Sequence, residues 1–265
     1  MVSPVEIQSP EFATSLIRQA ARETGANFEF LLSTAARESN FDPAAEARTS
    51  SAAGMYQFIE QTWLGMMDRH GADHGFEQLA GAIRRDSSGR YIVDDPAARE
   101  EILSLRFDAA ASARMAGELA AENAVVIEAA TGRPASSGEL YAAHFLGANG
   151  AAELITGAET NPDQRADRLF PAAARANRSI FYDGGRPRTA AEVLERLTGE
   201  AVAVQAAATP AHDASLSSVQ PAATGGFSGP LHTVSFSPGG GELSPMLVEI
   251  LASLEAPAAA RDRRS

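Results

Sequence analysis

The spacing of hydrophobic positions predicts helices through the first three-quarters of the chain. Apolar residues recur three and four positions apart over residues 10–23, 28–38 and 59–70, which is the pattern of helices that bury one face. Gly25 and Gly71 follow the first and third of these segments, and glycine commonly follows the last turn of a helix. We therefore expect three helices in this part of the chain.

The middle of the chain continues the helical pattern with many small side chains. Residues 96–130 carry alanine, serine and occasional large apolar residues at helical spacing, so we expect one long central helix that packs closely against its neighbours. Shorter helices are expected at 137–146, 150–155 and 190–197. Residues 82–94 break the pattern and are predicted to form a surface loop or a short hairpin. The predicted fold class is all-α.

The composition changes after residue 198. Residues 199–241 are dominated by Ala, Pro, Ser, Thr, Gly and Val, which is typical of a flexible linker. Residues 242–255 regain an apolar stripe at helical spacing, and a short isolated helix needs a surface to bury such a stripe. Two interpretations remain for this C-terminal amphipathic helix: it docks onto a partner protein, or it folds back or stays frayed. Residues 256–265 are predicted to be a disordered tail.

Glu38 is the candidate catalytic residue, because the helical pattern directs its carboxyl group inward. It lies three and seven positions after Ala35 and Leu31, so it shares a helix face with these apolar residues. Burial and the negative end of the helix dipole would both raise its pKa. A carboxyl group that stays protonated near neutral pH can act as a general acid. The alternative is a solvated glutamate at a fraying helix end.

Two motifs around Glu38 resemble the signature segments of soluble lytic transglycosylases. Residues 38–43 read ESNFDP and are similar to the family's E-S-x-F-[ND]-P, and residues 54–58 read GMYQF and are similar to its G-L-M-Q. The two motifs occur in the family's order and close to its usual separation. The resemblance covers residues 10–198 and implies a lysozyme-like helical domain with a substrate groove.

Two later segments extend the resemblance to one branch of the family. Residues 141–147 read YAAHFLG and fall where the family has A-Y-N-A-G, so that His144 and Phe145 stand at its Tyr and Asn positions. Residues 177–182 read NRSIFY. Together these segments resemble a proteobacterial branch that includes flagellum-associated members.

The resemblance implies the activity of a peptidoglycan lytic transglycosylase. Glu38 would protonate the glycosidic oxygen between N-acetylmuramic acid (MurNAc) and N-acetylglucosamine (GlcNAc), and would then accept the proton of the muramyl C6 hydroxyl as a carboxylate. That hydroxyl would attack C1 and form 1,6-anhydroMurNAc without water, while the substrate's acetamido group stabilises the charge at C1. This chemistry implies no metal and no organic cofactor.

The motifs also suggest which residues bind the glycan strand. The candidates that lie in or beside a motif are Ser50, Ser51, Met55, Tyr56, Gln57, His144, Phe145 and Tyr182. Several have a structural alternative. Gln57 is equally consistent with an interior turn amide, one of Met55 and Tyr56 with the core, and Tyr182 with buried packing. His144 has no partner at metal-ligand spacing, so its alternative is a structural histidine.

A second catalytic carboxylate is not expected. Ordinary glycosidases use two carboxyl groups, and the nearby candidates are Asp42, Glu46 and Glu60. Asp42 precedes a proline and fits a cap at the start of a short turn, while the two glutamates fit solvated faces. Ser39 is expected to hydrogen-bond the backbone at the helix end. These assignments favour a mechanism with a single acid.

Composition narrows the partners and the compartment. The net charge is −12, from 34 acidic against 22 basic side chains, which argues against nucleic acid as a partner. The chain has no cysteine and therefore does not depend on an oxidising compartment. No apolar run reaches membrane-spanning length. We expect a periplasmic protein. Because the first residues lack the features of an export signal, we expect that its signal has been removed or that it is exported by another route.

Three hypotheses follow from the sequence. The first is a lytic transglycosylase acting on peptidoglycan glycan strands, with 242–255 as a docking helix for a flagellar rod or rod-scaffold protein. The second is a hydrolytic muramidase, which would depend on a second carboxylate. The third is a non-catalytic wall-binding or scaffold module, whose function would survive the substitution Glu38→Gln.

Overall fold

The computed structural model describes residues 10–48 and 50–208, which form a mostly helical domain. Its elements are α1 (Pro10–Thr24), α2 (Phe28–Ser39), α3 (Glu60–His70), η1 (Ala72–His74), α4 (Glu77–Ala80), β1 (Ile83–Arg85), β2 (Tyr91–Val93), α5 (Pro96–Ser104), η2 (Leu105–Phe107), α6 (Ala109–Thr131), α7 (Ser137–Thr160), α8 (Ala166–Leu169), α9 (Pro171–Ala176), α10 (Arg178–Phe181), β3 (Tyr182–Asp183), β4 (Arg186–Pro187) and α11 (Ala190–Ala208). The prediction of a predominantly α-helical fold is confirmed.

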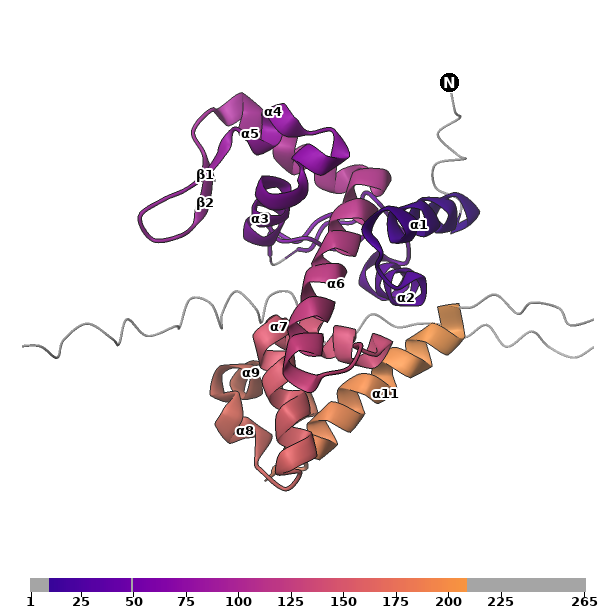
Figure 1. The fold of residues 1–265 in the computed structure, drawn as a ribbon, viewed down its shortest axis with the longest axis vertical. Helices are drawn as coiled ribbons and strands as arrows, with labels where there is room; N and C mark the ends of the chain where they lie inside the picture. The colour runs from indigo at the N-terminus through magenta and orange to yellow at the C-terminus, as the bar shows by residue number, and fades with distance from the viewer. Residues whose placement is uncertain (1–9, 49, 209–265) are drawn as a thin grey trace, which may run out of the picture.

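The elements gather into two groups along the long axis of the molecule, and helix α6 joins them (Figure 1). Helices α1 to α5 and the β1–β2 hairpin form one group, and α7 to α11 form the other. Helix α6 packs against α1 and α3 in the first group and against α7 in the second. Helix α11 packs along α7 and also contacts α2. The end of α2, which carries Glu38, therefore lies where the two groups meet.

Helix α2 has defined signals at both ends. At its start, Oδ1 of Asn27 accepts a hydrogen bond from the N–H of Phe30 at 2.8 Å, as N-cap residues do. At its end, Asn40 adopts a left-handed conformation (φ 53°) and donates its N–H to the carbonyls of Ala35 and Ala36, which closes the last turn. The predicted helix 28–38 is confirmed and is one residue longer.

The predicted single helix over 96–130 is wrong, because the chain turns at Asp108. This residue has extended backbone angles (φ −79°, ψ 113°), and its Oδ1 accepts a hydrogen bond from the N–H of Ala111 at 2.8 Å. The aspartate therefore separates α5 and η2 from α6 and caps the start of α6. Helix α6 nevertheless occupies the central position expected for the longer helix (Figure 1).

Helix α7 is interrupted at Gly147, whose backbone angles are φ 74° and ψ 162°. Glycine adopts positive φ without the steric cost that a Cβ imposes, so this residue permits the break. The sequence predicted separate helices at 137–146 and 150–155, and the interruption between them is confirmed. The break immediately follows the helical turn that carries His144 and Phe145.

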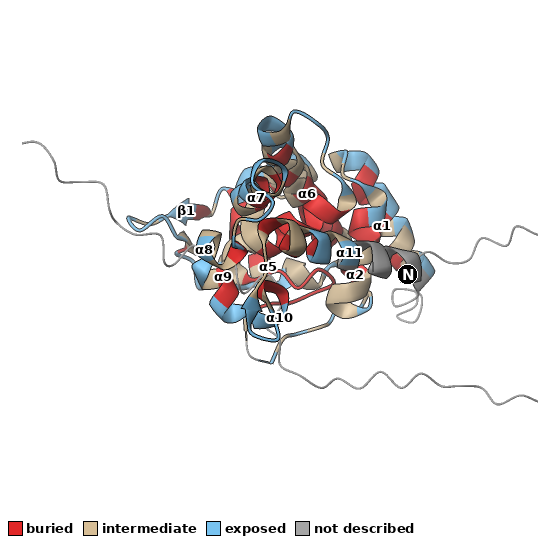
Figure 2. Cartoon of the chain, turned by 90° about the horizontal axis from the view of Figure 1, so that it is seen from below, coloured by how far each residue is buried: buried red, intermediate tan, exposed pale blue. Residues whose placement is uncertain are grey.

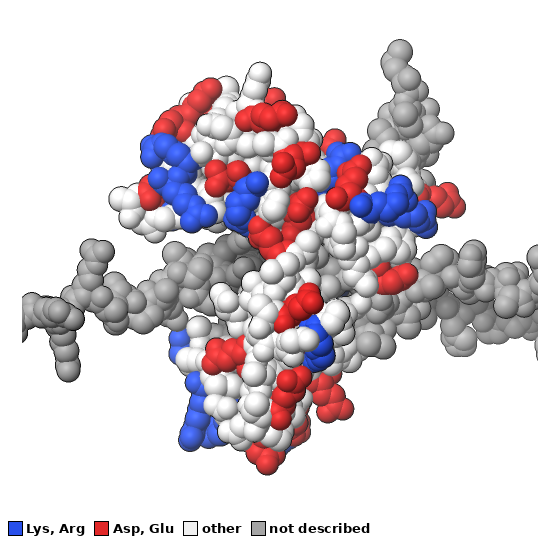
Figure 3. All heavy atoms as spheres, in the orientation of Figure 1, with Lys and Arg blue, Asp and Glu red and all other residues white. Residues whose placement is uncertain are grey.

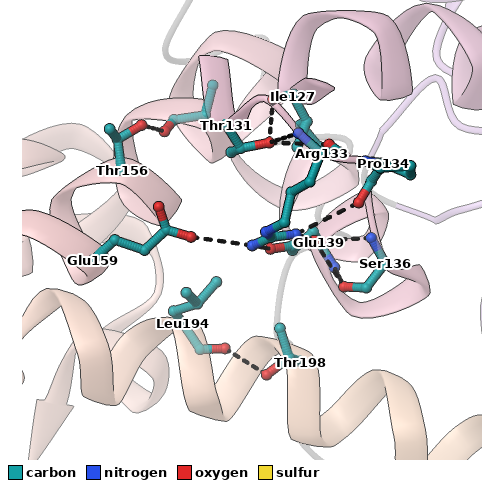
Figure 4. A network of polar contacts seen from close by, with 11 residues as sticks. Ile127, Thr131, Arg133, Pro134, Ser136, Glu139, Thr156, Glu159, Leu194 and Thr198 are labelled. Atoms are coloured by element: carbon teal, nitrogen blue, oxygen red, sulfur yellow. Dashed lines mark hydrogen bonds and ion pairs between the residues drawn. The ribbon is translucent and has the colours of Figure 1, made fainter. Parts of the chain in front are cut away.

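The connection between α6 and α7 is held by Arg133 (Figure 4). Its guanidinium contacts the two oxygens of Glu139 at 2.6 and 2.9 Å and one oxygen of Glu159 at 3.1 Å. Glu139 also accepts hydrogen bonds from the backbone N–H and the hydroxyl of Ser136, which completes a capping box at the start of α7. Burial raises the pKa of Glu139, but its bonds to Arg133 and Ser136 outweigh that effect and lower it. This network positions α7 relative to α6.

Two short hairpins complete the fold. Strands β1 and β2 pair antiparallel with Ile83 opposite Val93, and β3 and β4 pair antiparallel with Tyr182 opposite Pro187. The first hairpin shows that residues 82–94 form a short hairpin, which was one of the two predicted alternatives. The sequence did not predict the second, nor the short helices α4, α8, α9 and α10, because segments of two to six residues are too short to show a periodicity.

Buried residues concentrate where the helices face one another (Figure 2). The largest fully buried side chains include Trp63, Phe58 and Phe181, and the indole Nε1 of Trp63 donates to the carbonyl of Ile102 at 2.7 Å. Alanines fill much of the remaining core, especially on α6 and α7. Such small side chains allow the close helix packing that the sequence predicted.

Acidic and basic groups are interspersed on the face of the described residues shown in Figure 3. No broad basic area is seen on that face. None of the described helices is both long and apolar enough to cross a membrane.

The C-terminal predictions mostly lie outside the described residues. Helix α11 continues to Ala208, past the predicted start of the linker at 199. The remaining linker to residue 241, the docking helix 242–255 and the tail 256–265 lie outside the part of the chain that the structure describes.

Candidate active site

Glu38 lies in the last turn of α2 with its side chain only 5% exposed. The residues that share its stripe, Leu31, Thr34 and Ala35, are all buried. The inward direction predicted from the helical spacing is therefore confirmed, and the alternative of a solvated glutamate at a fraying helix end is wrong.

The turn of residues 53–58 is fastened to the end of α2 through Ser39. The hydroxyl of Ser39 donates to the carbonyl of Met55 at 2.8 Å, and the carbonyl of Ala35 lies 3.4 Å away. Both partners are backbone groups, so the expected structural role of Ser39 is confirmed. The two sequence motifs are thereby joined directly in space.

Gly54 allows this turn to pack closely against the segment that follows α5. Its φ is +79°, and a Cβ at this position would lie 1.9 Å from the carbonyl oxygen of Arg106. Any side chain would clash with the backbone there, so the glycine of the motif is required for packing. The guanidinium of Arg106 also donates to the carbonyls of Ser51 at 2.6 Å and Phe58 at 3.2 Å.

His144 approaches Glu38 from helix α7. Its Nε2 lies 3.2 Å from Oε1 of Glu38, and the two side chains are 8% and 5% exposed. The ring nitrogen is close enough for an ion pair but has no aligned hydrogen-bond partner. His144 was expected to bind the substrate or to be structural; the structure instead places it against the candidate acid.

Arg37 contacts the same carboxylate oxygen from the adjacent position on α2. Its Nη2 and Nε lie 3.1 and 3.3 Å from Oε1 of Glu38. The guanidinium also lies over the ring of Tyr141, 3.8 Å from the ring centre, and the Tyr141 ring stacks near that of His144 at 6.4 Å. Arg37 and His144 therefore bracket Glu38, and Tyr141 lies against both of them.

The expectation of a raised pKa for Glu38 is wrong. Burial does raise it, but the contacts with His144 and Arg37 outweigh burial and lower the pKa to about 2. Glu38 is consequently a carboxylate in the free protein at neutral pH. The sequence argument failed because it counted burial and the helix dipole without the two basic groups at the site.

The motif residues Gln57, Met55 and Tyr56 are interior rather than exposed. Gln57 has a positive φ of 49°, and its Nε2 donates to the carbonyls of Gly54 at 2.8 Å and Ala45 at 3.1 Å. Met55 and Tyr56 are buried in the core, and the Tyr56 hydroxyl donates to the carbonyl of Leu31 at 3.2 Å. The structure thus shows the interior-turn alternative for Gln57 and core packing for both Met55 and Tyr56.

The other predicted substrate-binding residues pack in the core or bond the backbone. Phe145 is buried and stacks with Phe181 at 6.5 Å. The hydroxyl of Ser50 accepts from the N–H of Ala52, and the exposed Ser51 accepts from the N–H of Glu60, both at 3.3 Å.

Tyr182 is partly exposed in β3. Its hydroxyl donates to Oδ2 of Asp167 at 3.0 Å, and Arg178 lies over its ring. These contacts account for its position without a substrate.

The three alternative carboxylates face solvent or have other contacts. Asp42 is exposed, and its Oδ1 accepts from the N–H of Ala44 at 2.8 Å, so it stabilises a turn as expected. Glu46 is exposed, and Glu60 pairs with Arg99 at 2.6 Å.

A small cavity of ≈ 20 Å³ lies beside His144, lined mainly by apolar side chains of α2, α6 and the 53–58 turn. It has room for about one water molecule and is too small for a sugar ring. A larger open hollow of ≈ 480 Å³ lies over α5 and η2, bordered by Arg106. Glu38 lines neither of them.

Sequence reasoning missed Arg37 and the role of Tyr141. Arg37 directly precedes the candidate acid, so its charge could have been considered, but adjacent helix positions point in different directions and no pattern fixed its rotamer. Tyr141 begins the YAAHFLG segment, but the sequence did not predict its contact with Arg37. Its position one turn before His144 was the available signal.

The described residues contain no group of three or more His, Cys, Asp or Glu side chains arranged to hold a metal ion. No family model matches the sequence.

Proposed function

We propose that this protein is a peptidoglycan lytic transglycosylase in which Glu38 is the single catalytic acid and base. The observation that supports this most strongly is a buried carboxyl group in the last turn of α2, next to Ser39, whose hydroxyl joins the end of this helix to the 53–58 turn. The two segments that resemble the transglycosylase motifs are thus brought together around one acid. A lysozyme-like domain with a substrate groove and a periplasmic location belong to the same proposal.

The proposed reaction needs one group that first gives and then takes a proton. Glu38 protonates the glycosidic oxygen as the bond from C1 of MurNAc to that oxygen breaks. The C6 hydroxyl of the same sugar then attacks C1, and its proton passes to the Glu38 carboxylate. The products are a 1,6-anhydroMurNAc end and a free GlcNAc hydroxyl, and water is not consumed. A second carboxylate is not required, in agreement with the exposed Asp42 and Glu46.

Access to Glu38 requires one of its two basic contacts to move. Its carboxylate is 5% exposed, and Arg37 is the contacting group that reaches solvent, with its side chain 23% exposed. A glycosidic oxygen that approaches from this side displaces the guanidinium, which can remain on the ring of Tyr141. Losing one cationic contact also makes the protonated form of Glu38 more favourable.

The substitution Glu38→Gln tests the proposal. The amide keeps the size of the side chain but cannot donate the proton as an acid, so we expect the release of soluble fragments from purified sacculi to fall at least about 1,000-fold. Glu46→Gln is the matched control, since this glutamate is exposed on the nearby loop, and it should retain parental activity. Full activity in Glu38→Gln would contradict the proposal and favour the non-catalytic wall-binding hypothesis.

A further inference from the structure

The pairing of Glu38 with His144 raises a question that the proposed reaction does not answer by itself. A general acid must carry a proton, whereas Glu38 in the free protein is held as a carboxylate by two basic neighbours. Of these neighbours, Arg37 does not release a proton in proteins, because a guanidinium is always charged. An imidazole exchanges its proton readily in the physiological pH range.

The geometry allows direct transfer between the two side chains. Nε2 of His144 and Oε1 of Glu38 are 3.2 Å apart, and the nitrogen is buried with no other hydrogen-bond partner among the described residues. His144 is carried by α7, whose start is fixed by the capping box and by Arg133. Glu38 is carried by α2, whose end is fixed by Asn40 and Ser39.

We propose that His144 is a positioning residue that holds the catalytic proton and delivers it to Glu38 when the glycan binds. This inference rests on the proposed function, because it concerns the proton that the transglycosylation step uses. In the resting state the proton is on Nε2 of His144 and Glu38 is ionised. The pair as a whole carries one proton.

Glycan binding shifts that proton because it removes water from the pair. Two neutral groups cost less to desolvate than two charged ones, so exclusion of water and displacement of Arg37 favour the neutral imidazole with the protonated carboxyl group. Glu38 then donates the proton to the glycosidic oxygen as the C1–O bond breaks. The C6 hydroxyl returns a proton to Glu38 as it attacks C1, and Glu38 returns it to His144. The cycle therefore consumes no proton.

Other titratable and charged groups near the pair do not offer the same route. Tyr56, in the turn that lines the cavity beside His144, is neutral because burial raises its pKa. Arg37 stays charged, and the Tyr141 ring lies beneath its guanidinium. Thr34 of α2 and Asn123 of α6 line the same cavity and do not titrate. Among these groups, His144 can both hold and give up the proton.

The pH dependence of the reaction tests the inference. The reactive state requires one proton on the pair, and the pH at which this proton is lost belongs to the pair as a whole. In His144→Gln the amide still offers an N–H donor but holds no transferable proton, so Glu38 alone must carry it. The measurement is kcat/KM on soluble uncrosslinked glycan strands as a function of pH. We therefore expect the alkaline limb, the part of this profile in which kcat/KM falls as the pH rises, to lie at least one pH unit lower in His144→Gln than in the parent.

A purely structural histidine would give a different result. In that case His144→Gln would keep the parental alkaline limb, even if activity fell at every pH, and this outcome would overturn the inference. Failure of the proposed function is recognised separately, because Glu38→Gln would then remain active or the parent protein would release no fragments. His144→Gln and Glu38→Gln should both be checked for parental circular dichroism before assay.

A second measurement needs no variant and no substrate. In protein labelled at glutamate carboxyl carbons and histidine nitrogens, NMR follows Glu38 and His144 as the pH changes. Before the pair loses its proton, the Glu38 signal should be that of a carboxylate and the His144 Nε2 signal that of a protonated nitrogen, and both signals should change in the same step when the proton is lost. A Glu38 signal that does not respond to that step would overturn the inference even if His144→Gln fails to fold.

Discussion

Two groups of histidines and carboxylates in the described chain differ in how well they are shielded from water. The Glu38–His144 pair lies in the interior, with both side chains under one-tenth exposed. The second group, which we name the outer cluster, joins α3 and η1 to α6 and consists of His70, His74, Glu118 and Glu122. Its side chains are 9% to 35% exposed, and its shortest contacts are 2.7 and 2.8 Å.

The two groups contain the same residue types, and the clearest difference is the exposure of their carboxylates, 5% for Glu38 against 17% for Glu118 and 35% for Glu122. In the outer cluster each glutamate has two basic partners: Glu118 pairs with His70 and His74, and Glu122 pairs with His70 and Arg69. Such partly solvated pairs contribute little each and depend weakly on any one member. In the interior pair, Glu38 keeps Arg37 when His144 is removed, but a side chain only 5% exposed leaves little water to replace the lost contact, so His144 strongly affects the stability of the carboxylate.

The largest expected effect comes from removing one member of the interior pair. His144→Ala leaves the Glu38 carboxylate buried with Arg37 as its remaining basic contact and also opens a cavity. We expect a loss of about 3 kcal/mol in the free energy of unfolding, measured by urea denaturation at neutral pH. A loss below about 1 kcal/mol would show that the interior pair behaves like the outer cluster.

Acid should weaken the interior pair in a defined pH range. Because the pKa of Glu38 is lowered from 4.5 to about 2 in the folded protein, its contribution to stability is complete above about pH 4.5 and is lost as the pH falls toward 2. Between pH 5 and pH 3 the parent should therefore lose about 2 kcal/mol more than Glu38→Gln. Parallel stability curves for the two proteins would contradict the lowered pKa.

The matched substitution in the outer cluster should cost less. His74→Ala removes a contact with Glu118 at 2.8 Å, but Glu118 keeps His70 as a neighbour and is partly solvated. We expect a loss of about 1 kcal/mol in the same urea experiment. An effect as large as that of His144→Ala would remove the distinction between the two groups.

Salt should produce the smallest effect and act on the outer cluster alone. At about 1 M salt the screening length falls to about 3 Å, so the cost of His74→Ala should shrink by a few tenths of a kcal/mol. The cost of His144→Ala should stay constant, because buried charges are screened much less. The check is to repeat both denaturation experiments at low and high sodium chloride concentration.

The sequence predicted the features that depend on local spacing and capping. The stripe of Leu31, Ala35 and Glu38 specified which way the acid points, and Ser39 was correctly expected to bond the backbone. The interruption near Gly147 was also anticipated. The break at Asp108 was missed, although an aspartate followed by small residues is a recognised N-cap signal, because helical periodicity continues on both sides of it.

The electrostatics of the site could not be predicted from the sequence. The pKa of Glu38 depends on His144, which is distant in the chain, and on the rotamer of Arg37, which no periodicity determines. The burial of Met55 and Gln57 likewise depends on tertiary contacts, because the 53–58 turn packs against Arg106. These properties arise from tertiary contacts, so the sequence pointed to segments that meet at the end of α2 but not to the ionisation state of Glu38.

The most direct test of the central proposal is mass spectrometry of the soluble fragments released from purified sacculi by the parent protein. If Glu38 works as the single acid and base, the fragments should end in 1,6-anhydroMurNAc, and their masses should be lower than those of the reducing-end fragments by one water. Reducing MurNAc ends would instead show hydrolysis by a muramidase, and the absence of fragments would show a non-catalytic role. Either result would contradict the account.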